Sequence, residues 1–242
     1  MTKVMGIVNV TPDSFSDGGQ FFRPEEAIRR AHNLIADGAD IIDLGGESTR
    51  PGATPLGWEE EWARLEPVLE GLVDLEKLGK VPLVSISVDT YHPETAARAI
   101  VAGAKIINCV FGEAVPEMLK LLDGNDVELV MPAKSFFSPS TMHQAPSTRL
   151  YLDPMIGFGT TREEDLALIR SIPELAKCGR VLVGASRKRI VKKLTGEKLT
   201  GKNLGGNLGI AIWAAMNGAS VVRVHDVKET VQALKVVAAL DE

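Results

Sequence analysis

Short runs rich in valine and isoleucine recur along the whole chain, and most are followed by a stretch whose apolar residues repeat at the period of a helix. The runs are apolar without polar alternation, which is typical of strands buried on both faces in a parallel sheet. The sequence therefore predicts eight strands: Val4–Asn9, Asp40–Gly45, Leu83–Asp89, Lys105–Cys109, Val127–Met131, Leu150–Asp153, Val181–Ala185 and Val221–His225.

Amphipathic stretches between these runs predict seven helices: Pro24–Ala36, Glu59–Leu75, Glu94–Ala102, Pro116–Leu122, Arg162–Lys177, Leu204–Met216 and Val227–Leu240. Glycines lie just before six of the strands, where a helix often ends on a residue with positive φ. These glycines are Gly38, Gly79, Gly103, Gly124, Gly179 and Gly218. The pattern is one of repeated β/α units.

Eight β/α units within 242 residues predict one domain, residues 1–242, folded as a (β/α)₈ TIM barrel. A doubly wound open sheet has the same local signals and stays open as an alternative. The fifth unit is the exception, because Pro132–Thr148 contains three prolines and no helical period. We expect an irregular loop there and no helix after the fifth strand.

Charge and composition exclude several classes of partner. The chain has 27 Lys and Arg against 32 Asp and Glu, with no basic run, so we expect no nucleic-acid partner. We find no signal peptide and no apolar run of membrane length, and we expect a cytoplasmic protein without a membrane partner. Cys109 and Cys178 lack the spacing of a disulfide framework or a zinc site.

Polar side chains finish nearly every predicted strand. In both candidate architectures ligands bind at the carboxyl ends of the strands, so these residues are the candidates for a site. A single one of them would more often be a helix cap or a loop anchor, but the whole set favours a ligand. The set consists of Asn9, Asp43, Glu47, Asp89, Asn108, Asp153, Ser186, Arg187, Lys188, Arg223 and His225.

Three of these residues, Asp89, Asn108 and Asp153, would share one pocket in a barrel. A buried carboxylate is costly unless it is paired, and the N–H edge of a flat, nitrogen-rich ring would supply that pair. We expect apolar walls from Ile7, Ile86, Ile106 and Met131. The alternative is an internal ion pair of Asp153 with Lys188 or Arg223.

A second group, from the first, second and eighth units, is cationic. Arg50, Arg223 and His225, with Asn9, form a candidate clamp for phosphate or pyrophosphate, in which Asn9 could orient a Mg²⁺ ion. The loops at residues 9–19 and 45–52 are long, rich in glycine and charged, as loops that close over a substrate are. Phe15 within the first loop fits closure onto an apolar group.

The same residues carry a resemblance to a known family. In order and spacing, the chain resembles the dihydropteroate synthases at the segments 5–19, 43–52, 87–90, 152–154, 157–159, 186–188 and 223–226. The first two, MGIVNVTPDSFSDGG and DLGGESTRPG, are long and specific. The resemblance implies a (β/α)₈ barrel that joins p-aminobenzoate to a 7,8-dihydropterin carried as its hydroxymethyl pyrophosphate, giving dihydropteroate for folate synthesis.

By position, the resemblance implies a role for each candidate residue. The pterin would be held by Asp89, Asn108, Asp153 and Lys188, with Phe158 nearby. Pyrophosphate, with Mg²⁺, would be held by Asn9, Arg50, Arg223 and His225. The aminobenzoate site would be shaped by Phe15, Thr49, Pro51, Arg187 and Lys188. Asp89, Asp153 and Lys188 are the candidate catalytic residues, and the family and the apolar helix Leu204–Met216 suggest a homodimer.

The chain also departs from the family pattern. It has Cys109 where the family usually has Asp, Met155 where it has Gly, and Thr160 where it has Lys. A Met-His pair after the fifth strand is absent as well. With the fifth helix missing, Phe136, Phe137 and Met142 are candidates to cover the exposed barrel wall.

Two rival functions share the pterin residues. One is a pterin-binding barrel that serves methyl transfer to a corrinoid protein, and the other is a non-catalytic paralogue that only binds the pterin. Methyl transfer needs no pyrophosphate clamp, and the retention of both long loops argues against the paralogue. The synthase is therefore our interpretation of the sequence.

Overall fold

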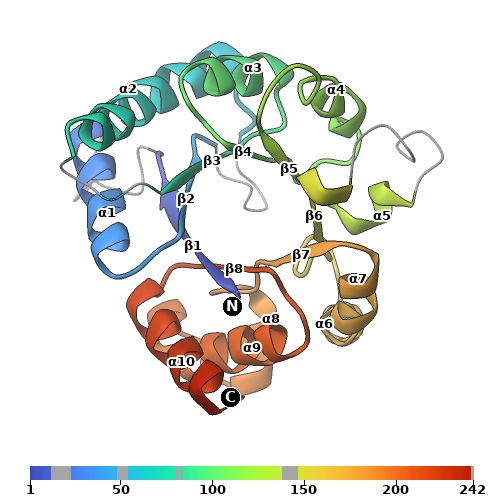
Figure 1. The fold of residues 1–242 in the computed structure, drawn as a ribbon. Coiled ribbons are helices and arrows are strands. Elements are labelled where there is room, and N and C mark those ends of the chain that lie inside the picture. Colours follow the sequence, from blue (N-terminus) through green and yellow to red (C-terminus); the bar gives the residue numbers. More distant parts are fainter. Residues whose placement is uncertain (12–22, 48–53, 80–81, 83, 138–146, 241–242) are drawn as a thin grey trace.

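The computed structural model describes residues 1–11, 23–47, 54–79, 82, 84–137 and 147–240. Its strands form one closed, all-parallel barrel in sequence order, and the pairing of Lys3 in the first strand with Val221 in the last closes it (Figure 1). Closure confirms the barrel and excludes the open sheet. The strands are β1 (Lys3–Asn9), β2 (Ile41–Gly45), β3 (Ser85–Asp89), β4 (Ile106–Asn108), β5 (Glu128–Pro132), β6 (Leu150–Asp153), β7 (Arg180–Val183) and β8 (Val221–Val224).

Helices ring the barrel on the outside (Figure 1). They are α1 (Pro24–Ala36), α2 (Trp58–Lys77), α3 (Pro93–Val101), α4 (Val115–Lys120), α5 (Ala133–Phe136), α6 (Arg162–Arg170), α7 (Ile172–Cys178), α8 (Arg189–Thr195), α9 (Leu204–Met216) and α10 (Val227–Leu240), with 3₁₀ turns at Ser147–Arg149 and Thr200–Lys202. Within the described ranges, none of the helices combines the length and apolarity that a membrane span requires.

Two helices differ from the sequence prediction. The segment Arg162–Lys177 is divided at Ser171 into α6 and α7, because Pro173 has no N–H to donate and occupies the first turn of a new helix. The prediction of one continuous helix was wrong at this point. The short basic helix α8 was not predicted, since its seven residues carry too few turns to show a period.

The fifth unit lacks a full helix in the part of it that the structure describes. Only the four residues of α5 follow β5, and residues 138–146, including Met142, lie outside the described residues. Phe136 packs against the core, whereas Phe137 is 53% exposed. Arg149, just before β6, connects to the segment between α4 and β5, because its guanidinium donates to the carbonyls of Leu122 and Val127.

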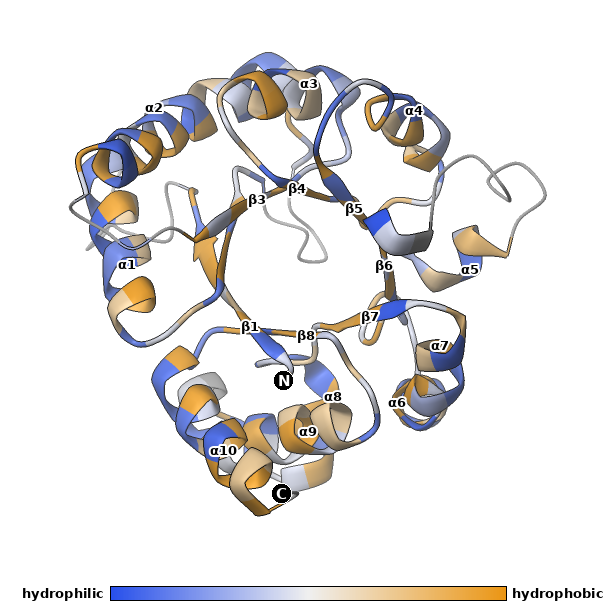
Figure 2. Cartoon of the chain, viewed as in Figure 1, coloured by the Kyte–Doolittle hydropathy of each residue, from blue (hydrophilic) through white to orange (hydrophobic). Residues whose placement is uncertain are grey.

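Two apolar cores result from the alternation of side chains along each strand. One lies between strands and helices, and the other fills the barrel with Met5, Ile41, Ile106, Val130, Tyr151, Leu182 and Val221. The strands are mainly apolar with polar residues chiefly near their ends, whereas most helices alternate between apolar and polar residues (Figure 2). Ile86 and Met131 belong to the outer core, so the prediction that they line the pocket was wrong. Successive side chains of a strand point to opposite faces, and these two occupy the positions that face the helices.

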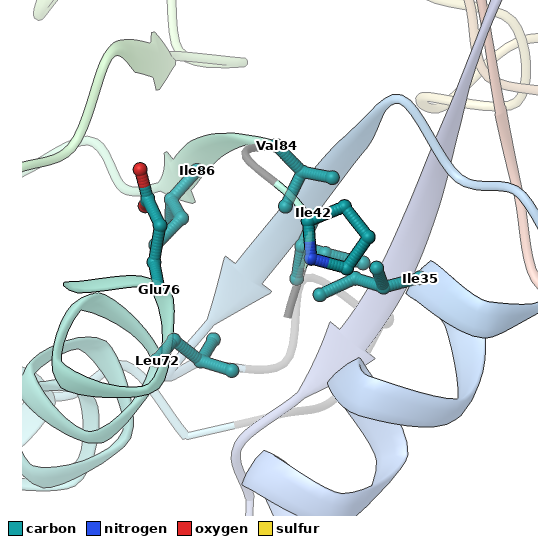
Figure 3. Close-up of a pocket in the computed structure, with 7 residues that line it drawn as sticks. Ile35, Ile42, Leu72, Glu76, Val84 and Ile86 are labelled. Carbon is teal, nitrogen blue, oxygen red and sulfur yellow. The ribbon is translucent and has the colours of Figure 1, made fainter. Parts of the chain in front are cut away.

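A small cavity of about 10 Å³ lies in the outer core near the amino ends of β2 and β3. Figure 3 shows side chains of α1, α2, β2 and β3 around it, among them Ile35, Ile42, Leu72 and Ile86. This volume is about that of one water molecule, and the walls are mainly apolar. The cavity is a packing defect and too small for an organic ligand.

Five of the six glycines predicted to end helices have positive φ, between +64° at Gly79 and +112° at Gly103. Gly179 is the exception, because its φ of 172° is extended backbone that any residue adopts. Gly218 is the most constrained of the set. A Cβ atom there would lie 2.9 Å from the Cβ of Ala176 on α7, in addition to the strain of its φ of +90°.

This geometry predicts the effect of Gly218→Ala. Gly196 has φ of +74°, but a Cβ atom there would meet no described atom within 4 Å, so Gly196→Ala reports backbone strain alone, about 1–2 kcal/mol. We expect Gly218→Ala to lower the free energy of unfolding by a further ~1–3 kcal/mol, because the added methyl group overpacks the contact with α7. Urea denaturation measures both, and equal losses would contradict the contact.

Candidate active site

The polar strand ends meet inside the carboxyl end of the barrel. Adjacent strands pair Gly45 with Asp89, Asp89 with Asn108, and Pro132 with Asp153. Side chains at every second position point inward, and Asp43, Asp89, Asn108, Asp153 and Arg223 share that inward phase with the apolar residues that fill the barrel. The structure thus brings together the predicted residues of the ring pocket.

Asp43 is the fully buried centre of this arrangement. Its carboxylate accepts hydrogen bonds from Ser87 Oγ at 2.5 Å, Arg223 Nε at 2.6 Å and Asn108 Nδ2 at 3.2 Å. Three donors offset the cost of burying one charge.

The sequence marks Asp43 as a polar strand end but assigns it no role in the ring pocket or the anion clamp. The signal available in the sequence was a charged residue inside the otherwise apolar run IIDLG.

Arg223 joins three strands of the barrel. It starts from β8 and donates to Asp43 on β2 and, through Nη2 at 2.8 Å, to Asp89 on β3. Burial raises the pKa of Asp89 to about 7, although Arg223 opposes the shift. In this structure Arg223 is therefore an internal partner of two carboxylates.

Asn108 has a buried hydrogen-bond acceptor that is not used within the described part of the chain. Its Nδ2 is used by Asp43, and its buried Oδ1 has no hydrogen-bond partner among the described residues. A buried acceptor without a partner costs about 1–3 kcal/mol, which a ligand N–H group would recover. The site thus contains an acceptor that an N–H donor of a ligand could use.

Asp153 and Lys188 lie in the same pocket without a mutual ion pair. Asp153 accepts the backbone N–H of Met155 at 2.7 Å, and Lys188 Nζ donates to the carbonyl of Ile156 at 2.6 Å while lying 4.3 Å from the centre of the Phe158 ring. Within the described residues, Asp153 forms no salt bridge with Lys188 or Arg223, so the internal-pairing alternative is not observed.

Burial sets the charge state of this pair. It raises the pKa of Asp153, with Lys188 opposing the shift, and it lowers the pKa of Lys188 to about 8, with Asp153 opposing. Each group lacks full compensation for its burial. A ligand that donates to Asp153 and accepts from Lys188 would supply what both lack.

The loop after β6 shows what the departures from the family pattern do. Met155 has φ of +66°, a left-handed conformation that favours glycine, so the side chain found there is strained. The Thr160 hydroxyl accepts the N–H of Gly157 at 3.1 Å and donates to Asp165 of α6 at 2.5 Å. Thr160 therefore fixes the loop to a helix.

Cys109, the third departure, is a buried free thiol. Its side chain is 1% exposed, and burial raises the pKa of the thiol to about 12, so it stays protonated at neutral pH.

His225 and Ser186 join the loops after β8 and β7. Ser186 Oγ lies 3.1 Å from His225 Nδ1. Burial, together with Arg187 and Arg223, lowers the pKa of His225 to about 4. The imidazole is consequently neutral at pH 7 and could act on an anion only as a hydrogen-bond donor.

Several predicted site residues are not placed by the structure. Phe15, Thr49, Arg50 and Pro51 lie outside the described residues. The convergence of Arg50 with Arg223 and His225 on one anion therefore stays a prediction. In the described parts of the chain, no group of three or more His, Cys, Asp or Glu side chains could hold a metal ion.

Comparisons with known proteins identify the family of this chain. The sequence model of the family described as pterin binding enzyme matches residues 5–149 and 140–225. Dihydropteroate synthase of Escherichia coli is 37% identical, over 98% of this chain and 90% of that protein. A probable bifunctional folylpolyglutamate synthase/dihydropteroate synthase of Haloferax volcanii is also 37% identical, over 98% of this chain, which spans 30% of its length.

Solved structures show the same similarity. Dihydropteroate synthase of Xanthomonas albilineans with 4-aminobenzoic acid superposes with a TM-score of 0.87 at 38% identity, covering 99% of this chain and 93% of that one. The same enzyme in complex with 7,8-dihydropteroate gives a TM-score of 0.83 at 35% identity, covering 99% and 94%.

The ion pairs of Arg223 predict a large and pH-dependent effect of Arg223→Met. Removing the cation leaves two buried carboxylates unpaired, and we expect a loss of about 3–5 kcal/mol in the free energy of unfolding at pH 8. In the variant the folded-state pKa of Asp89, which burial already raises, rises further above its unfolded value, near 4. The folded state then binds more protons, so the loss becomes smaller at pH 5.

Urea denaturation of the variant and the wild type at both pH values measures this difference. Arg162→Met is the matched control, because Arg162 is 43% exposed and, among the described residues, forms an ion pair only with the exposed Glu163. We expect a loss of less than about 1 kcal/mol there. A loss from Arg223→Met that is as small as the control, or equal at pH 8 and pH 5, would contradict the buried network.

Proposed function

This chain belongs to the dihydropteroate synthase family of pterin-binding enzymes, and we propose on that premise that it joins a 7,8-dihydropterin, supplied as its hydroxymethyl pyrophosphate, to p-aminobenzoate. The products are dihydropteroate and pyrophosphate, and the enzyme is a transferase. The observation that carries the proposal is the pocket of Asp89, Asn108 and Asp153, with its unpartnered acceptor, at the end of the barrel where such folds bind ligands.

The pocket fits the edge of a pterin ring. Two carboxylates and the Asn108 carbonyl oxygen can accept from ring and exocyclic N–H groups, and Lys188 can donate to a ring acceptor. Phe158, beside the Lys188 ammonium, provides apolar surface at the pocket wall. Asp89, with its pKa near 7, gains a donor when the ring binds, which favours its ionised form.

The reaction needs no nucleophilic side chain. The bond between the methylene carbon and the pyrophosphate oxygen breaks, the amine nitrogen of p-aminobenzoate forms a bond to that carbon, and the nitrogen releases a proton. The protein must hold the ring, stabilise the departing negative charge and exclude water. We assign the ring to Asp89, Asp153 and Lys188, and the leaving group to Arg50, Arg223 and His225.

Mg²⁺ is part of this proposal. The only protein ligand that we assign is Asn9, the last residue of β1, which is half-buried and whose side chain makes no hydrogen bond to another described residue. One amide oxygen suits a Mg²⁺ ion that arrives with the pyrophosphate and keeps several waters. When bound, the ion would neutralise charge on the leaving group.

We also propose a homodimer formed through α9 and its surroundings. The helix is apolar along most of its length (Figure 2), and exposed apolar side chains gather on and before it: Leu194, Leu199, Trp213 and Met216. A second copy of the chain would cover this surface. A cytoplasmic location belongs to the same proposal and is supported by the two free thiols, which suit a reducing compartment.

The decisive experiment is a pyrophosphate-release assay on the purified protein. We expect release from 7,8-dihydropterin hydroxymethyl pyrophosphate to depend on both p-aminobenzoate and Mg²⁺. Binding of the pterin without release, for every arylamine tried, would reject the synthase and favour a binding paralogue. Methyl transfer from a methylated pterin to a corrinoid would instead favour the second rival.

The assay also tests the role of Asp153. In Asp153→Asn an amide NH₂ group replaces one carboxylate oxygen and faces the N–H donors of the ring. A hydrogen bond is therefore replaced by a repulsive contact between two donors. We expect kcat/KM to fall by about 2–4 kcal/mol in transition-state binding, roughly 30- to 1000-fold. The matched control is Asp126→Asn, at a fully exposed position with one weak surface pair, where we expect no change.

Thermal unfolding separates this effect from loss of the fold. Because burial raises the pKa of Asp153, replacing its carboxylate with an amide should leave the melting temperature equal or higher. A variant that is inactive because it does not fold, or one with wild-type kcat/KM, would contradict the assignment of Asp153 to the pterin.

A further inference from the structure

Asn207 is a buried amide in the first turn of α9, away from the pterin pocket, and no step of the proposed reaction uses it. Its Oδ1 accepts the backbone N–H of Arg187 at 3.0 Å, and its Nδ2 donates to Asp226 Oδ2 at 3.3 Å. Asp226 Oδ1 in turn accepts from Arg187 Nη2 at 2.6 Å. The three residues therefore form a closed cycle that begins and ends on Arg187.

Arg187 is the residue that requires such support. Its φ of +60° is left-handed, and it shares this property only with Met155 among the non-glycine residues that the structure describes. A non-glycine residue in this conformation costs about 1–2 kcal/mol and persists where its surroundings determine it. The hydrogen bond from its N–H to Asn207 fixes the backbone, and the ion pair with Asp226 fixes the guanidinium.

The position of Arg187 in the chain makes this conformation consequential. Ser186 before it contacts His225, and Lys188 after it lies over Phe158 in the pterin pocket. A change of the Arg187 backbone would move its N–H away from Asn207 and its guanidinium away from Asp226. The bond of Lys188 to the carbonyl of Ile156 holds Lys188 separately.

We propose that Asn207 is a positioning residue for the arylamine site, which acts by holding Arg187 in its left-handed conformation and by orienting Asp226 toward the guanidinium. This inference rests on the proposed function, together with the family resemblance, which implies that Arg187 shapes the aminobenzoate site. An amide is required at this position, since one group must accept from a backbone N–H while the other donates to a carboxylate. The effect falls on p-aminobenzoate and not on the pterin.

The polarity of the cycle provides the test. In Asn207→Asp the new carboxylate can still accept from the Arg187 N–H, but it faces Asp226 with a second negative charge and no donor. Adding Asp226→Asn to this variant reverses the direction of the bond. The amide then at position 226 would donate to the carboxylate at position 207 and accept from Arg187, with the net charge of the cycle unchanged from wild type.

We expect Asn207→Asp to raise the KM for p-aminobenzoate about tenfold, which lies in the middle of the range of interaction energies between residues in direct contact. The KM for the pterin pyrophosphate should change less than about twofold. The double variant should recover to within about threefold of wild type, because the cycle is restored. The matched control is Asn217→Asp at the other end of α9, where the side chain donates only to the carbonyl of Trp213. We expect wild-type constants there.

Three results would overturn the inference: an unchanged KM for p-aminobenzoate in Asn207→Asp, an equal rise in KM for both substrates, or no recovery in the double variant. Wild-type turnover is measured first, because its absence rejects the proposed function and not the cycle. In that case crystal structures of the wild type and Asn207→Asp decide the inference. A left-handed Arg187, paired with Asp226 in both proteins, would then contradict it.

Discussion

The ion pairs of Arg223 with Asp43 and Asp89 are the interaction on which the rest of the site depends. Arg223 lies on the last strand, and both of its partners lie beyond the first strand, on β2 and β3. The same contact therefore spans the closure of the barrel and fixes the floor of the pocket. Asp43 also accepts hydrogen bonds from Ser87 and from Asn108 Nδ2, and Asn108 Oδ1 stays without a hydrogen-bond partner among the described residues.

Around this centre the two loops after β7 and β8 are joined residue by residue. Ser186 contacts His225, Arg187 pairs with Asp226, and Asn207 completes the second connection from α9. Paired strand ends thus hold Asp89, Asn108 and Asp153, while a hydrogen-bonded cycle holds the neighbouring loop. Groups positioned before the substrate arrives need little reorganisation during the reaction, which is the main advantage of such a site.

Much of this was predictable because strand periodicity and strand ends are local signals. The strands, most of the long helices and the residues Asp89, Asn108 and Asp153 follow from them. The sequence could not show that Ile86 and Met131 face outward, because a shift of a single residue exchanges the inward and outward faces of a strand. It could not show that Arg223 is held by two carboxylates, because Arg223 and Asp43 are 180 residues apart in the chain. It also could not show that Asn207 contacts Arg187, 20 residues before it, because both contacts form only in the folded barrel.

A crystal structure of the protein with a 7,8-dihydropterin bound tests the central claim most directly. We predict that the ring lies at the carboxyl end of the barrel, with its N–H groups donating to Asp153 and to the Asn108 carbonyl oxygen, while Arg223 keeps both of its carboxylate partners. A ring bound elsewhere, or one bound in the barrel while the Asn108 oxygen stays without a partner, would contradict the account.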